Sequence, residues 1–210
     1  MLFSIILFFV YIWGFGNVVG LIVKESDDFL ERNLMRLGLG LGIMLTLGLL
    51  MNLLRIPLDW RFFLILCIIP ILFRIYRSIR NKTIGKFQNL NINFYALGML
   101  ILFGISFSMY HKGAFIYPYL EDDDSWNHAI GVKYVSLEKT VFAREDQKIR
   151  YADPYPPTYD MLIGIMHQTH DSLYWGLKFF NALIISMSLI YFFFFVKVFT
   201  KSSKKALFSS

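Results

Sequence analysis

Five long apolar segments limit what this chain can fold into. They cover residues 2–23, 34–54, 56–73, 92–110 and 173–199. A helix needs roughly 20 apolar residues to cross the hydrocarbon core of a bilayer, and inside it every backbone polar group must be hydrogen-bonded internally. Because 56% of the residues are hydrophobic and only 17% are charged, a water-soluble domain of this length would be hard to keep in solution. The sequence therefore predicts an all-α, polytopic transmembrane helical protein embedded in the lipid bilayer.

The positions of Lys and Arg predict how the chain is oriented. Cytoplasmic connections keep an excess of positive charge when a membrane protein inserts. Two strongly basic stretches, residues 74–86 and 197–205, are therefore expected to be cytoplasmic. The N-terminus is then outside, residue 210 is cytoplasmic, and we expect a multi-pass protein of a prokaryotic plasma membrane. The net charge of +6 comes mainly from these helix ends, which argues against a nucleic-acid partner.

The chain divides into four predicted parts. Residues 1–112 form four transmembrane helices, and residues 113–172 form a long extracytoplasmic acidic loop that contains amphipathic interfacial helices. Residues 173–199 form the fifth transmembrane helix, and residues 200–210 form a cytoplasmic turn that leads into a further helix. The loop holds ten of the fifteen acidic residues but only five of the twenty-one basic ones. Loops of this length are usually functional or disordered, and the aromatic residues of this one argue against disorder.

Two short helices are expected within the loop. The first is predicted after the acidic run, because apolar residues recur there at near-helical spacing: Trp126, Ile130, Tyr134 and Leu137. Asp124 or Ser125 is expected to be its N-cap. The second follows Pro156 and Pro157, which suit the start of a helix. Its apolar residues, expected on one face along the membrane surface, are Tyr159, Leu162, Ile163 and Met166.

The acidic run is the strongest candidate for chemistry. Glu121, Asp122, Asp123 and Asp124 are consecutive, and His128 follows one helical turn after Asp124. A hard divalent ion such as Mg²⁺ or Mn²⁺ prefers oxygen ligands, so Asp122 and Asp124, with His128, could hold a metal. Alternatively, one of the three aspartates could act as a general base towards an acceptor, or the run could be a solvated turn in which His128 only bonds to Asp124. The position of the run at the membrane surface favours a functional role.

Other side chains of the loop and its borders are candidates for binding. The candidates for substrate binding are Glu121, Trp126, Tyr155 and Tyr159. The candidates for contact with a phosphate are Lys112, Lys133 and Lys178, although Lys178 is more simply explained as a side chain that extends toward the interface. His167 and His170 lie near Asp171 at a spacing that suits metal ligands, but on an interfacial helix we expect them to face the headgroups.

Two short motifs in the loop resemble those of a known family. Residues 121–128 read Glu-Asp-Asp-Asp-Ser-Trp-Asn-His, and residues 155–159 read Tyr-Pro-Pro-Thr-Tyr. An outer loop with these features between two spans resembles that of the C-type (GT-C) membrane glycosyltransferases. The first motif is similar to the Asp-x-Trp-Tyr-His motif of archaeal oligosaccharyltransferase catalytic subunits, and the second to protein mannosyltransferases. The resemblance covers residues 110–210, and several spans precede the loop where many relatives have one.

The resemblance implies an activity and a site. Enzymes of this superfamily transfer a sugar from a polyprenyl-phosphate-linked donor to a protein or glycan acceptor on the outer face. Asp124 would align with the catalytic or metal-binding aspartate, with Asp122 and Asp123 as its neighbours. The chain would then be the transferase or its N-terminal catalytic segment.

Two other functions also fit the sequence. A non-enzymatic transporter or accessory subunit for lipid-linked saccharides would share the topology, and a structural scaffold could use the acidic loop to bind a partner or Ca²⁺. A transporter is expected to carry ionisable residues near the middle of its spans. The predicted spans contain almost none, which favours a site at the membrane surface.

Overall fold

Helices account for the regular secondary structure of residues 1–22, 25–81, 93–142 and 156–210, which are the residues that this computed structural model describes. Five of them are long and apolar enough to cross a membrane: α1 (Leu2–Ile22), α2 (Phe29–Leu53), α3 (Trp60–Arg80), α4 (Phe94–Ala114) and α7 (Leu173–Thr200). The shorter helices are α5 (Asp123–Glu138), α6 (Thr158–His167) and α8 (Ser203–Ser209). The prediction of an all-α polytopic membrane protein is confirmed.

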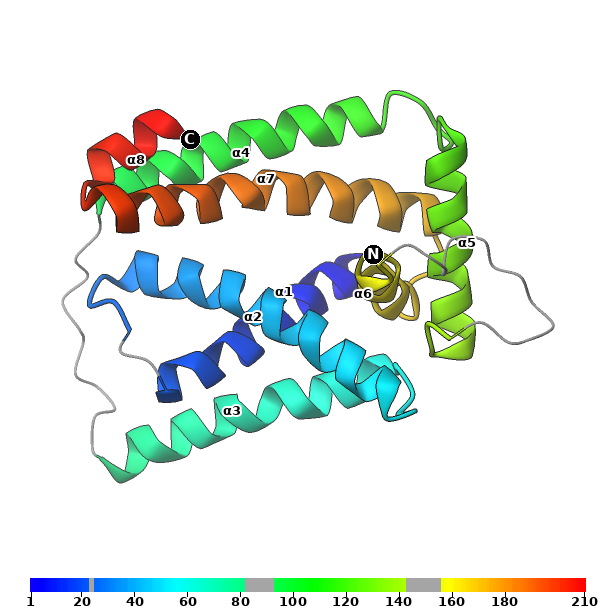
Figure 1. Ribbon diagram of the computed structural model, residues 1–210, viewed down its shortest axis with the longest axis horizontal. Helices are drawn as coiled ribbons and strands as arrows, with labels where there is room; N and C mark the ends of the chain where they lie inside the picture. The colour runs from blue at the N-terminus through cyan, green and yellow to red at the C-terminus, as the bar shows by residue number, and fades with distance from the viewer. Residues whose placement is uncertain (23–24, 82–92, 143–155) are drawn as a thin grey trace.

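The long helices form two packed groups (Figure 1). α1 packs against α2 and α3, and α4 packs against α7 and α8. The core continues between the groups, since the rings of Phe8 on α1 and Phe180 on α7 have centroids 5.3 Å apart. α5 and α6 pack against each other at one end of the long helices, and α5 runs across their direction. We call this end of the molecule the α5 end.

Polar caps set the boundaries of the long helices, and these boundaries differ from the predicted ones. Asp28 caps α2 by accepting the backbone N–H of Glu31 at 2.8 Å, so the helix begins before the predicted residue 34. Asp59 caps α3 by accepting the N–H of Arg61 at 2.9 Å, which leaves residues 56–59 outside the helix. Apolar runs mark the part of a helix that lies in hydrocarbon, whereas its hydrogen bonds continue through polar turns. Hydropathy alone therefore misplaces the helix ends.

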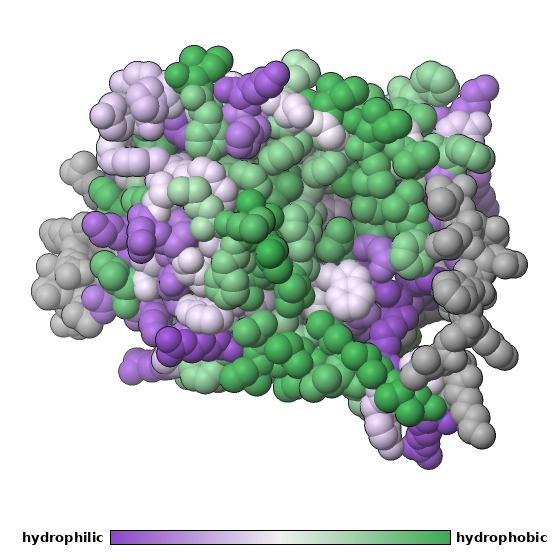
Figure 2. Space-filling model, turned by 180° about the vertical axis from the view of Figure 1, so that it is seen from behind, coloured by the Kyte–Doolittle hydropathy of each residue, from purple (hydrophilic) through white to green (hydrophobic). Residues whose placement is uncertain are grey.

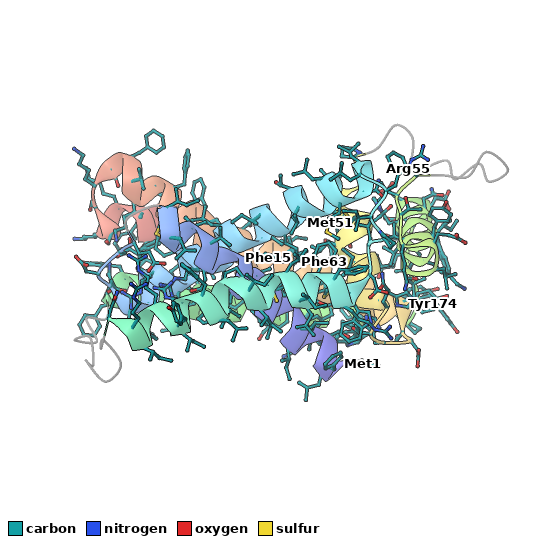
Figure 3. All side chains as sticks on the ribbon, turned by 90° about the horizontal axis from the view of Figure 1, so that it is seen from below. Met1, Phe15, Met51, Arg55, Phe63 and Tyr174 are labelled. Carbon is teal, nitrogen blue, oxygen red and sulfur yellow. The ribbon has the colours of Figure 1, made fainter. Side chains whose placement is uncertain are left out.

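A buried core joins α1, α2 and α3. Phe15 and Phe63 point toward each other between α1 and α3, with ring centroids 6.5 Å apart (Figure 3). Met51 of α2 belongs to the same buried cluster. On the face shown in Figure 2, hydrophobic side chains cover much of the middle of the molecule, and hydrophilic ones gather mainly toward its two ends. This distribution suits a chain with hydrocarbon around its middle and water at its ends.

The N-terminus and the loop helices share the α5 end. The hydroxyls of Ser4 on α1 and Thr169, which follows α6, are hydrogen-bonded at 2.7 Å. At the opposite end, the ammonium of Lys197 donates to the carboxylate of Glu31 at 2.5 Å. The predicted orientation requires the N-terminus and the loop on one side. That this side is the outer one still rests on the Lys and Arg pattern and stays a prediction.

The loop helices depart from the prediction in two ways. α5 is capped by Asp122, not by Asp124 or Ser125, because the Asp122 carboxylate accepts the N–H of Ser125 at 2.8 Å. α6 is not a helix with one covered face, since residues 160–166 are all buried. It packs against α5 and α7 and also touches α1 and α2. Periodic spacing identifies a helix but does not reveal how many of its sides are covered.

Candidate functional site

A pocket with a volume of about 670 Å³ lies where α4, α5, α6 and α7 meet. Part of its wall is apolar and comes from α4 and α7, through Met109, Tyr110, Leu177, Ala182 and Ile185. Another part is polar and comes from α5 and the segment before it, through Glu121, Asp122, Asp124, Ser125 and His128. The pocket is therefore amphiphilic, and it lies at the end of the spans where the loop helices cross them.

His128 is held between two carboxylates in the polar part of the wall. Its Nδ1 lies 2.7 Å from Oδ1 of Asp160, and its Nε2 lies 4.0 Å from Oδ2 of Asp124. The side chain of Asp124, on α5, is 63% exposed, whereas that of Asp160, on α6, is 11% exposed. Burial raises the pKa of Asp160, and the hydrogen bond with His128 opposes this effect. The imidazole thus connects a buried carboxylate to the pocket.

Asp160 is a candidate site residue that the sequence pattern did not single out. It follows Tyr159 and precedes the apolar residues 161–166 of the same helix. A carboxylate in such an apolar setting is costly unless it has a partner. That cost is the signal that could have drawn attention to it, but the sequence does not say that the partner is His128 on another helix.

The three predicted catalytic aspartates occupy different positions. Asp124 lines the pocket and faces His128. Asp122 also lines the pocket, but its carboxylate caps α5, and the hydrogen bonds with Ser125 lower its pKa. Asp123 is exposed in the first turn of α5 and is not one of the described residues that line the pocket. Of the three, Asp124 has the position best suited to chemistry.

The predicted substrate-binding residues are only partly brought together. Glu121 and Tyr159 line the pocket, and the ring of Tyr159 packs edge-on against His128 with centroids 5.2 Å apart. Trp126 is not among the described lining residues, and its ring packs edge-on against α7 instead. Tyr155 lies outside the described residues.

Lys178 on α7 adds a cation to the pocket wall. Its Nζ donates to the backbone carbonyl of Tyr117 and lies 5.8 Å from the ring centroid of Phe115. Lys112 and Lys133 are not among the lining residues in the part of the chain that the structure describes. Of the three predicted phosphate contacts, Lys178 is therefore the one placed at the pocket.

The carboxylates and histidines do not converge into a metal centre within the described ranges. There, no group of three or more His, Cys, Asp or Glu side chains is arranged to hold a metal ion. Asp122, Asp124 and His128 line the same pocket, but Asp122 is engaged as a helix cap and His128 is bonded to Asp160. Binding of Mg²⁺ or Mn²⁺ by these residues stays a prediction.

His167 and His170 form a separate cluster at the end of α6. Their rings have centroids 5.2 Å apart, and His170 also packs edge-on against Trp175. Within the described structure, Nδ1 of His167 and both ring nitrogens of His170 are buried and lack a hydrogen-bond partner. Burial lowers the pKa of His170 to about 4. These nitrogens are packed inside the protein, which differs from the headgroup-facing position expected for them.

The fold and the pocket together define a polytopic α-helical membrane protein with an amphiphilic pocket at one end of its spans. No protein-family model, curated protein or solved structure matches this chain. Its function must therefore be inferred from the pocket and from the sequence motifs around it.

Proposed function

We propose that this protein is a GT-C type glycosyltransferase, or the N-terminal catalytic segment of one. It transfers a sugar from a polyprenyl-phosphate-linked donor to a protein or glycan acceptor on the outer face. The amphiphilic pocket carries the proposal, because its wall combines carboxylates and a histidine with the apolar side chains of two spans. A lipid-linked sugar has the same division between a hydrocarbon chain and a charged, polar head.

Each part of such a donor has a counterpart in the pocket. Leu177 and Ile185 of α7, with Met109 of α4, offer an apolar surface to the polyprenyl chain. Lys178 offers a positive charge to the phosphate. The sugar and the acceptor would meet near Asp124, whose carboxylate is open to solvent. The pocket lies at the helix ends, so an acceptor from the aqueous side can reach it.

The substitution Asp124→Asn is expected to lower sugar transfer by about 100-fold or more. The amide keeps the size of the side chain but removes the charge that faces the pocket and His128. The measurement is transfer of radiolabelled sugar from polyprenyl-phosphate mannose or glucose to acceptors of the source membranes, by the full-length protein in proteoliposomes.

Asp171→Asn is the matched control for this measurement. Asp171 is also exposed, follows α6 at the α5 end, and is not one of the described residues that line the pocket. The control variant should transfer sugar at close to the wild-type rate. Wild-type transfer by Asp124→Asn would contradict the proposal.

The same pocket would also serve a carrier or accessory subunit for lipid-linked saccharides. Such a protein would bind the donor through the apolar wall and Lys178 but would leave the sugar on its lipid. Binding of the labelled donor by the wild-type protein, with no transfer to any acceptor, would favour this alternative.

A further inference from the structure

We infer that His128 takes the proton from the acceptor and that Asp160 is the positioning residue that holds His128 for this task. The inference rests on the proposed function and deepens it in two respects. It assigns the proton acceptor to an imidazole and not to the acidic run, and it names a hydroxyl as the acceptor group. Its basis is the contact between α5 and α6 beside the pocket.

The contact with Asp160 determines which nitrogen of His128 acts as the base. An ionised carboxylate only accepts hydrogen bonds, so Nδ1 of His128, 2.7 Å from Oδ1 of Asp160, carries a proton. Nε2 on the other side of the ring is then the unprotonated nitrogen. This nitrogen is the one 4.0 Å from Asp124, in the pocket wall. A buried carboxylate that orients an imidazole in this way is the arrangement found in Ser-His-Asp triads.

Asp160 reaches His128 because α5 has no side chain at Gly131. A Cβ added at Gly131 would lie 2.1 Å from Oδ2 of Asp160 and 2.8 Å from its Cγ. Gly131 lies three residues after His128 and so on nearly the same face of the helix. The glycine leaves room for the carboxylate of α6 against the backbone of α5. Since Asp160 is only 11% exposed, its bond to His128 is largely shielded from water, which strengthens it.

His128 suits the role of base better than the aspartates of the acidic run. Near neutral pH an imidazole is a stronger base than a solvent-exposed carboxylate, and Asp124 is largely exposed. After proton transfer, the imidazolium would face Asp160 on one side and Asp124 on the other. Both carboxylates stabilise that positive charge. Asp124 is then needed for its charge, and His128 for the proton.

The proposed step is a displacement at C1 of the sugar, with the acceptor hydroxyl as nucleophile and the polyprenyl phosphate as leaving group. The oxygen of the acceptor hydroxyl forms a bond to C1 of the sugar, and its proton passes to Nε2 of His128. The bond between C1 and the phosphate oxygen breaks, and its electron pair leaves with the polyprenyl phosphate. The imidazolium then returns its proton to water through the pocket.

Variants of the full-length protein test the inference in the same radiolabelled transfer assay. His128→Ala is expected to lower kcat by about 100-fold or more, and added imidazole to restore transfer by at least about 10-fold. Asp160→Asn is expected to lower kcat by about 100-fold with little change in KM, because an amide does not hold the imidazole in the required tautomer. Asp124→Asn, tested with the same imidazole, is the control that should not respond.

The outcomes separate this inference from the proposed function. Rescue of His128→Ala, but not of Asp124→Asn, supports the assignment. Normal transfer by His128→Ala, or a loss in Asp160→Asn that appears in KM alone, overturns the inference and leaves the proposed function standing. No transfer by folded wild-type protein with either donor overturns both. If His128→Ala aggregates in detergent, His128→Gln decides, since a loss confined to kcat supports the base role and a loss confined to KM overturns it.

Discussion

Replacing Glu25 with glutamine is expected to lower the free energy of unfolding by about 1–3 kcal/mol. Glu25 ties together three long helices at the end opposite α5. Its carboxylate accepts hydrogen bonds from Nε of Arg36 on α2 at 2.7 Å and from Nη2 of Arg74 on α3 at 2.8 Å, and Arg74 also donates to Asn17 on α1 at 2.8 Å. The Arg36 side chain is only 8% exposed, so the variant would leave a buried guanidinium without its counter-charge. Unfolding of the purified protein in detergent measures the effect.

Asp27→Asn is the matched control for Glu25→Gln. Asp27 belongs to the same connection between α1 and α2 but is exposed. Substitutions at such positions usually change stability by no more than about 0.5 kcal/mol. An equal loss of stability in the two variants would show that the Glu25 contacts do not stabilise this end of the molecule.

Acid titration provides a second check on Glu25. Burial alone would raise the pKa of Glu25, but the hydrogen bonds and charges of Arg36 and Arg74 outweigh it and lower the pKa from 4.5 to about 2. Because the folded-state pKa lies below that of the unfolded chain, this stabilisation is complete above about pH 4.5 and is lost as the pH falls toward 2. The wild-type protein should therefore lose more stability than Glu25→Gln over this range. Parallel losses would contradict the assignment.

Replacing Gly40 with alanine is expected to lower the free energy of unfolding by about 1–3 kcal/mol or more. α1 and α2 cross with their backbones in contact, and a Cβ at Gly40 would lie 1.6 Å from the carbonyl oxygen of Ile12 and 2.7 Å from the backbone nitrogen of Gly16. A carbonyl within a helix cannot turn aside as a flexible side chain can, so the two helices would have to separate. Close approach at small residues is typical of membrane helix pairs.

Gly42→Ala is the matched control, since it makes the same chemical change on the same helix. A Cβ at Gly42 would meet nothing within 4 Å, and alanine favours a helix over glycine by up to about 1 kcal/mol. The two substitutions should therefore shift the unfolding midpoint in detergent in opposite directions. A shift of the same sign and size would mean that α1 and α2 do not cross at Gly40.

The five spans could be predicted because each depends on a property of a single segment. A long apolar helix satisfies its own backbone and needs no partner to be recognised. The helix ends were harder to predict, because they depend on individual caps such as Asp28 and Asp59 that lie beyond the apolar runs. In α5, the N-cap is Asp122 and not the predicted Asp124 or Ser125, because Asp122 also lies beyond the periodic part of the helix.

The faces of the loop helices could not be read from spacing. Ile130 and Leu137 of α5 are exposed, whereas Ala129 and Val132 are buried. Gly131 on α5 allows Asp160 of α6 to approach, and Ile130 and Leu137 are left outside the contact although Tyr134 is buried. Which face is covered was decided by the docking of α6, a helix that begins only at Thr158.

By itself the sequence determined the membrane class, the number of spans and the acidic segment that contributes Asp124 and His128 to the pocket wall. Charge, hydropathy and helical spacing depend only on neighbouring residues, so they can be evaluated from the sequence alone. Only the tertiary structure decided that Asp160 lies 2.7 Å from His128 and that α4 and α7 supply the apolar wall. Those placements depend on how helices distant in sequence pack against each other. A hydrogen bond between one buried carboxylate and one imidazole produces no repeating pattern in the sequence, so it could not be predicted from spacing.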